Sequence, residues 1–336
     1  MLLLVVVGPL VLAAHRVWGL PRGLVTQFEH VRWEGMTLWD LIMPCFIFMC
    51  GVSVPYALTK RKVRPWGGWA YWRHVLGRVA LLWILGMAVQ GNLLTLDFHR
   101  ISPYNNTLQT IAAGYLIAAS VLLVPWRWLR WSAPVLLAAV YGVLLACFGD
   151  MTPEGNFAIA IERCVLPVNQ DGYSWVLTTL MFGAMTLCGC HCAQLLRSEW
   201  PKGMKVVALG GVGILLLCLG WGLTPWVPAV KRIFTVSFAS QAMGWCVLAL
   251  ATLYFVVDVL GLCVGVGVVT LFGQNALLAY LCEELFHPAI DALASILTAG
   301  VPHWLGAETY PFVRAVTNVY IIIAILAIRQ RLRTTR

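Results

Sequence analysis

Charge is scarce in this sequence. Charged residues make up 11% of the 336 residues, with 14 acidic side chains against 23 Lys and Arg, whereas soluble domains carry roughly 25%. Apolar residues reach 60%, and the mean hydropathy is +0.82. This excludes a soluble globular fold, which could not cover so much apolar surface. The net charge of +9 is concentrated in basic loops, so we predict no nucleic-acid partner.

The apolar segments also lack the alternation of apolar and polar residues that marks membrane β-strands. They are about 20 residues long, which is the length a helix needs to cross the hydrocarbon core. The sequence therefore predicts an all-α polytopic transmembrane helix bundle, in which helices satisfy the backbone polar groups. No linker, soluble domain or internal repeat is visible, so residues 1–336 are expected to form a single integral-membrane domain. About ten spans are expected, at 2–20, 38–58, 75–95, 108–125, 131–148, 174–196, 204–223, 236–258, 264–286 and 311–328.

Basic residues are distributed unevenly between the expected loops. The loops after the second, fourth and sixth spans and the C-terminal tail hold twice as many Lys and Arg as the loops on the other side. Because basic loops stay in the cytoplasm, both termini are predicted to be cytoplasmic, in a bacterial inner membrane. The loop containing His30 would then face outward. Segment 288–303 is too short to span and is expected to be a re-entrant or interfacial helix.

The loop that leads into the second span is the first candidate site. It contains His30 close to Glu29, Glu34 and Asp40. Asp40 enters the apolar segment, where an ionisable group is expensive and points to function. A carboxylate beside a histidine can orient it as a general base. The alternative is an interfacial histidine without a role. Asp40 and Glu34 would orient His30, or be held by a buried partner such as Arg78 or Asn106.

Amides at the entrance to the fourth span form a second candidate. Asn106 and Gln109 could cap that helix, or they could present their amides to sugar hydroxyls or to a developing oxyanion. Capping is the interpretation that the residues alone favour.

Polar residues inside the ninth expected span form a third candidate. Gln274, Asn275 and Glu283 need internal partners in lipid. Glu283 and His287 stand four residues apart, on one helix face. Both a His–carboxylate site and a structural hydrogen-bond cluster fit this pattern.

Neither the cysteines nor the basic loop identify a site by themselves. Cys188, Cys190, His191 and Cys192 cannot converge on a metal from one helix, because Cys190 points away from its neighbours. No metal site is predicted. The loop from Lys60 to Arg73 fits the positive-inside signal, with contact to anionic lipid. It also fits a landing site for an anionic cosubstrate such as coenzyme A.

Three segments carry a family resemblance. Residues 30–53 read HVRWEGMTLWDLIMPCFIFMCGVS, residues 108–116 read LQTIAAGYL, and residues 273–280 read GQNALLAY. In this order they resemble the patterns H-x-x-W-x-G-x-T-x-x-D-L-x-x-P-x-F-x-F-x-x-G-x-S, L-Q-R-I-G-x-x-Y-L and G-x-N-A-x-x-x-Y. These patterns belong to the heparan-α-glucosaminide N-acetyltransferase-like membrane acyltransferases, including bacterial members of the domain-of-unknown-function type. Thr110 stands where the family pattern has arginine.

The resemblance implies acetyl transfer from cytoplasmic acetyl-CoA to a glucosamine amino group, or another glycan acceptor, on the periplasmic side. His30 matches the family's active histidine. We expect Asp40 and Glu34 to assist it, and a lipid bilayer and a glycan or amino-sugar acceptor as partners; a homodimer is left open. The remaining expected site residues are Trp33, Asn106, Gln109, Gln274, Asn275 and Glu283 for the acceptor, and Arg61, Lys62 and Arg78 for acetyl-CoA. The rival hypothesis is a sugar or lipid transporter or flippase without acyl transfer.

Overall fold

A computed structural model describes residues 3–58, 68–90, 93–94, 102–166 and 173–334. It is 76% helical, and the part of the chain that it describes has no strand. The predicted all-α helical bundle is confirmed. Contacts within the chain divide it into two compact units, one built from residues 1–30, 37–42 and 262–336 and the other from residues 31–36 and 43–261.

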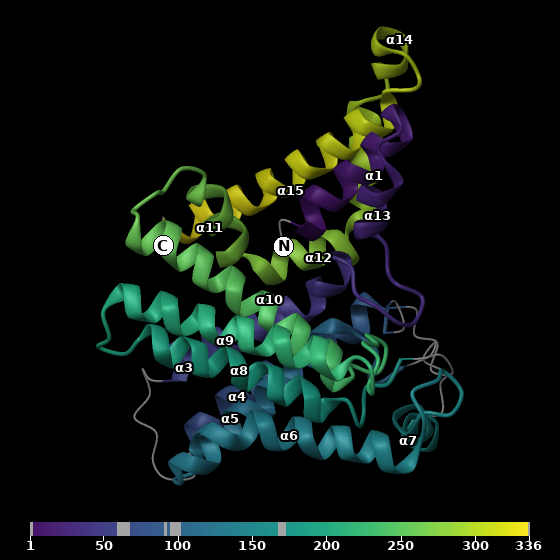
Figure 1. The fold of residues 1–336 in the computed structure, drawn as a ribbon. Coiled ribbons are helices and arrows are strands. Elements are labelled where there is room, and N and C mark those ends of the chain that lie inside the picture. Colours follow the sequence, from purple (N-terminus) through teal and green to yellow (C-terminus); the bar gives the residue numbers. More distant parts are fainter. Residues whose placement is uncertain (1–2, 59–67, 91–92, 95–101, 167–172, 335–336) are drawn as a thin grey trace. The chain divides into compact units, whose positions relative to one another are not determined.

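The first unit brings together segments from both ends of the sequence. Its longest helix, α15, packs against α1 and α13 (Figure 1). α1 ends where Gly19 adopts a left-handed φ of 63° and its N–H bonds to the carbonyl oxygen of His15, as is common at helix ends. Its elements are η1 (Leu3–Val7), α1 (Gly8–Trp18), α2 (Arg22–Val25), η2 (Thr26–Phe28), η3 (Trp39–Leu41), α11 (Val266–Gln274), α12 (Ala276–Glu284), α13 (His287–Leu297), α14 (Val301–Leu305) and α15 (Tyr310–Thr334).

The second unit contains most of the long apolar helices. α9 and α10 form its most extensive helix pair, and α8 packs against α5 and α6 (Figure 1). Its elements are α3 (Ile42–Leu58), α4 (Trp69–Val89), α5 (Thr107–Leu123), α6 (Arg127–Phe148), α7 (Phe157–Val165), α8 (Thr179–Leu196), α9 (Lys202–Leu223), α10 (Val236–Tyr254) and η4 (Phe255–Val259).

Close backbone contacts make α8 the centre of this unit. Among the candidate spans it has the largest buried share, with 61% of its 18-residue apolar window buried. A methyl group on Gly51 of α3 would overlap the carbonyl oxygen of Thr186, and one on Gly189 of α8 would overlap that of Phe48. Small residues at crossing points let membrane helices approach closely. The two glycines therefore set the distance between α3 and α8.

The expected number of spans needs correction. Every expected span overlaps a helix, but only seven described helices are long and apolar enough to cross a membrane, or eight if the bent pair α11–α12 is one span. The other two expected spans correspond to the shorter apolar helices Val5–Trp18 and Thr107–Leu123. At 1.5 Å per residue these are about 21 and 26 Å long, less than the roughly 30 Å hydrocarbon core.

The third and ninth expected spans also need correction. The third span was expected at 75–95, but α4 covers Trp69–Val89, because Trp69 and Trp72 begin the helix instead of preceding it. The ninth span was expected to be continuous from 264 to 286, but it breaks at Asn275 with a bend of 77°. Segment 288–303 forms the short helices α13 and α14, which agrees with its being too short to span.

Candidate functional site

The loop between η2 and η3 brings its two ends into contact. η2 ends at Phe28, and Glu29 continues in an extended conformation. The rings of Phe28 and Trp39 lie 6.3 Å apart, and Phe28 is buried, so an apolar contact ties the two short helices together. The N–H of Asp40 donates to the carbonyl oxygen of Thr37 at 3.2 Å, which begins η3. Residues ten positions apart in the sequence therefore meet.

The closed loop places His30 against Asp40. Nδ1 of His30 lies 2.7 Å from Oδ1 of Asp40, and the side chains are 50% and 1% exposed. A carboxylate at this distance fixes the imidazole ring and selects the tautomer with the proton on Nδ1. Nε2 is then the basic ring nitrogen. Asp40, one of the nearby carboxylates named by the sequence, is bonded to the ring.

Thr37 holds the other oxygen of Asp40. Its backbone N–H donates to Oδ2 at 3.2 Å, and its hydroxyl lies 3.0 Å from the same atom. The hydroxyl also lies 2.8 Å from the carbonyl oxygen of Glu29, and its single proton serves one acceptor at a time. A buried carboxylate needs such donors on both oxygens. Asp40 is therefore bonded to His30 and to Thr37 of its own loop.

The intervening residues Trp33, Glu34 and Gly35 belong to the second unit. The indole N–H of Trp33 donates to the carbonyl oxygen of Met151 at 2.9 Å. Glu34 forms an isolated antiparallel bridge with Val230, and Gly35 has a φ of 113° that favours glycine. Glu34 is exposed and lines an open cavity of about 620 Å³. The cavity is also lined by Trp221, Thr224, Pro225, Pro228, Ala229 and Gln241.

Asn106 and Gln109 organise the start of α5. The side chain of Asn106 accepts from the N–H of Leu108 at 2.8 Å, which makes it the N-cap. Gln109 is fully buried. Its amide accepts from the N–H of Asn105 and donates to the carbonyl oxygen of Pro103, both at 2.8 Å. These bonds occupy both ends of the Gln109 amide, so the capping interpretation accounts for the contacts at this entrance.

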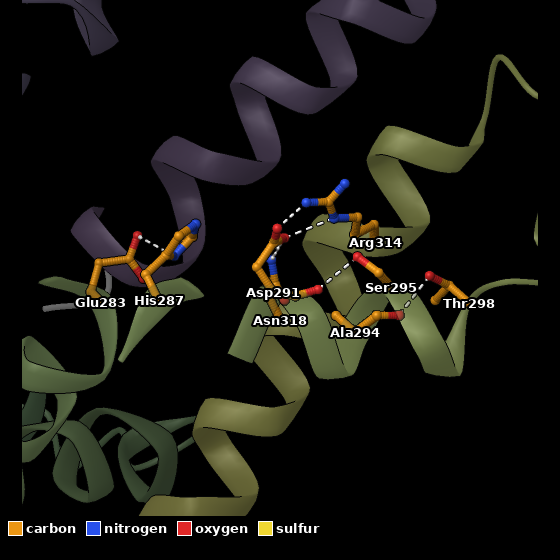
Figure 2. A network of polar contacts seen from close by, with 8 residues as sticks. All are labelled: Glu283, His287, Asp291, Ala294, Ser295, Thr298, Arg314 and Asn318. Atoms are coloured by element: carbon orange, nitrogen blue, oxygen red, sulfur yellow. Dashed lines mark hydrogen bonds and ion pairs between the residues drawn. The ribbon is translucent and has the colours of Figure 1, made fainter. Parts of the chain in front are cut away.

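The polar residues of the ninth expected span divide at the helix break. Asn275 is 2% exposed and lies between α11 and α12. The neighbouring Gln274 is exposed, and its Oε1 accepts from Gln330 at 3.2 Å. Glu283 lies on α12 with an oxygen 4.0 Å from Nδ1 of His287 (Figure 2). The expected proximity of Glu283 and His287 is confirmed, but the two residues lie on separate helices, α12 and α13, and not on one helix face. Gln274 is exposed, whereas Asn275 is buried.

A polar cluster joins α13 and α15, and the sequence did not predict it. Asp291 binds the guanidinium of Arg314 through both oxygens, with Nε 2.7 Å from Oδ1 (Figure 2). Asn318 donates to the same Oδ1 at 3.1 Å. The pair joins residues 23 apart in the chain, and nothing local in the sequence marks such a contact. The only available signal was the presence of two opposite charges near expected span ends.

Glu162 is a second buried carboxyl that the sequence did not single out. It lies on the short helix α7 and is 3% exposed. Its Oε2 accepts from the N–H groups of Trp175 and Val176, both at 2.9 Å, while Oε1 has no partner among the described residues. Burial raises the pKa of Glu162, and the two backbone hydrogen bonds oppose that increase.

The residues expected to bind acetyl-CoA are only partly described. Arg61 and Lys62 lie outside the described residues. Arg78 of α4 is partly buried, and its guanidinium lies 4.8 Å from the centre of the Tyr115 ring on α5, a cation–π distance. Within the described part of the chain, no group of three or more His, Cys, Asp or Glu side chains is arranged to hold a metal ion.

Comparison with known proteins adds no relative. No family model matches the chain, and a search of curated proteins found no match. The family resemblance of residues 30–53 therefore stays a prediction.

Proposed function

We propose that the protein is a membrane-embedded acyltransferase. It would move an acetyl group from cytoplasmic acetyl-CoA to an amino sugar or other glycan acceptor on the periplasmic side. The observation that carries this proposal is the contact of His30 with Asp40 at 2.7 Å, with the carboxylate buried and the ring half exposed. A buried carboxylate that orients a reachable imidazole is the arrangement of a general base.

In this proposal His30 accepts one proton from the acceptor and passes it to coenzyme A. Nε2 takes the proton from the acceptor amine or hydroxyl as that group attacks the thioester carbonyl carbon. The new C–N or C–O bond forms, the C–S bond breaks, and the proton passes to the sulfur of coenzyme A. Asp40 stabilises the imidazolium and keeps the ring oriented. A transient acetyl-histidine is the alternative route, and it would also use Nε2 because Nδ1 faces Asp40.

Arg78 supports the donor side of the proposal. A guanidinium within an apolar helix is expensive unless it serves a partner, and its described contact is an aromatic ring, not a carboxylate. Such a cation suits the phosphates of coenzyme A. Arg61 and Lys62 would extend this basic surface toward the cytoplasm.

One observation favours transport as a second candidate function. Broken helices near the membrane midplane are typical of transporter binding sites, and α11–α12 breaks by 77° at a buried asparagine. Substrate flux in proteoliposomes without release of coenzyme A would support this candidate over acyl transfer.

The proposal predicts that His30 and Asp40 act as one unit. With purified protein, acetyl-CoA and glucosamine-containing acceptors, His30→Ala and Asp40→Asn should each lower acetyl transfer by about 10²- to 10⁴-fold. The asparagine would favour the wrong histidine tautomer. Glu29→Gln is the matched control, because Glu29 contributes its backbone carbonyl to the described contacts. Acetyl transfer at the wild-type rate by a folded His30→Ala protein would remove His30 from the mechanism.

A further inference from the structure

The break between α11 and α12 interrupts an apolar pair of helices. The two helices together are long and apolar enough to span a membrane, but they are bent by 77° at Asn275. At such a break the last carbonyl groups of one helix and the first N–H groups of the next lose their intrahelical partners. Lipid supplies no replacement, so non-helical backbone at membrane depth is tolerated where it faces protein or a polar ligand.

Asn275 brings a further oxygen to this break. Its Nδ2 donates to the carbonyl oxygen of Leu271 at 3.0 Å, so the amide lies over the last turn of α11. The residue is 2% exposed, and its Oδ1 has no hydrogen-bond partner in the described part of the chain. A buried acceptor is rarely left unpaired, so this atom points to a ligand that donates a proton or carries positive charge.

The chain beside the break is open on one side, at the exposed Gly273. Gly273 has no neighbour within 4 Å of the position where a Cβ would stand. The first turn of α12 has no side-chain cap. Gln274 does not fill the position, because its side chain is exposed and bonded to Gln330. The amide of Asn275 is therefore the side-chain group held at the break itself.

The chemistry of the break favours a monovalent cation. The carboxyl end of a helix carries partial negative charge, and the atom available there is a neutral amide oxygen. Ca²⁺ and Mg²⁺ sites use carboxylates, but Glu283 and Glu284 lie eight and nine residues further along, about 12 Å by helical rise. Carbonyl oxygens at broken helices are known ligands for alkali cations.

We infer that the α11–α12 break binds an alkali cation through Oδ1 of Asn275 and backbone carbonyl oxygens at the end of α11. This inference does not rest on acyl transfer, because His30 and Asp40 take no part in it. Failure of the acyltransferase assay would leave it intact, and the reverse also holds.

The test measures cation binding to the full-length protein in nanodiscs. The melting temperature is followed in chlorides of Na⁺, K⁺ or Li⁺, against N-methyl-D-glucamine at constant ionic strength. One alkali cation should raise the melting temperature with the logarithm of its concentration, as mass action requires. Direct binding of ²²Na⁺, with the other cations as competitors, gives the affinity.

Variants locate the site. Asn275→Leu should weaken cation affinity by about tenfold or more, and Asn275→Asp should strengthen it by adding charge. Asn318→Leu is the matched control, because Asn318 also has an unpartnered amide oxygen in the described residues but lies on α15. Equal melting temperatures in all cations would overturn the inference. So would unchanged affinity in Asn275→Asp, which keeps the size of the side chain and is informative even if the leucine variant does not fold.

Discussion

Asp40 is a buried carboxylate whose cost is offset within its own loop. Each of its oxygens has a donor, from His30 on one side and from Thr37 on the other. Removing one partner of a buried charge is strongly destabilising, so the loop constrains the ring as firmly as the ring constrains the loop. This mutual restraint is what a general base needs, because an imidazole that rotates freely would spend little time in a reactive orientation.

Glu162 is also a buried carboxyl group that accepts hydrogen bonds, but its donors are backbone N–H groups. Its two backbone hydrogen bonds fix the turn that precedes α8, where a negative charge near the helix N-terminus is favourable. Yet the burial that accompanies this position raises the pKa of the carboxyl above its usual range. The folded protein then binds more protons than the unfolded chain between the two pKa values.

This difference predicts a pH-dependent stability for Glu162. Because the folded pKa is raised, the stability contribution of the protonated form is lost as pH rises through the unfolded and then the folded pKa. Glu162→Gln keeps an acceptor for both N–H groups and should flatten this part of the stability profile. Glu162→Ala should cost about 1–3 kcal/mol for each orphaned N–H. Thermal unfolding across the acidic range checks both, and an unchanged slope in the glutamine variant would contradict the assignment.

At the scale of elements, apolar run length was a reliable guide to helices and a poor guide to crossings. All ten expected spans overlap helices, because lipid-facing backbone has to be helical. Length and straightness depend on packing, which a hydropathy window does not see. α5 begins at Thr107, one residue before its expected start, and ends at Leu123, two residues before its expected end. The ninth span breaks at Asn275, where the sequence shows the polar pair Gln274 and Asn275 but not the bend.

The α3–α8 crossing gives a prediction at this scale. Gly51→Ala would drive a methyl group into the backbone of Thr186 and should destabilise the protein by about 1–3 kcal/mol, as overpacking does. Gly210→Ala on α9 is the control, because a Cβ there meets nothing within 4 Å and alanine is the better helix former. Melting temperatures of the two variants should differ in sign relative to wild type. Equal tolerance of both would mean that the helices do not approach at Gly51.

At the scale of the whole molecule, local contacts were predictable and distant ones were not. His30 and Asp40 are only ten residues apart, so the sequence could suggest their pairing. Asp291 and Arg314 come from helices separated by α14, and their pairing depends on how α13 packs on α15. The cavity beside Glu34 is likewise built by residues about 200 positions away. Such sites require tertiary structure.

The positions of the two termini show whether the number of crossings is odd or even. Seven crossings would place the termini on opposite faces of the membrane, whereas eight or ten would place them on the same face. Counted over ten spans, the distribution of Lys and Arg predicts that both are cytoplasmic. An even number of crossings, with the α11–α12 pair as one full crossing, would agree with that prediction. Green fluorescent protein fused to either end should fluoresce, and alkaline phosphatase inserted between α14 and α15 should be active. A fluorescent N-terminal fusion with a dark C-terminal fusion would instead make the α11–α12 pair re-entrant, with Asn275 approached from the face where it began.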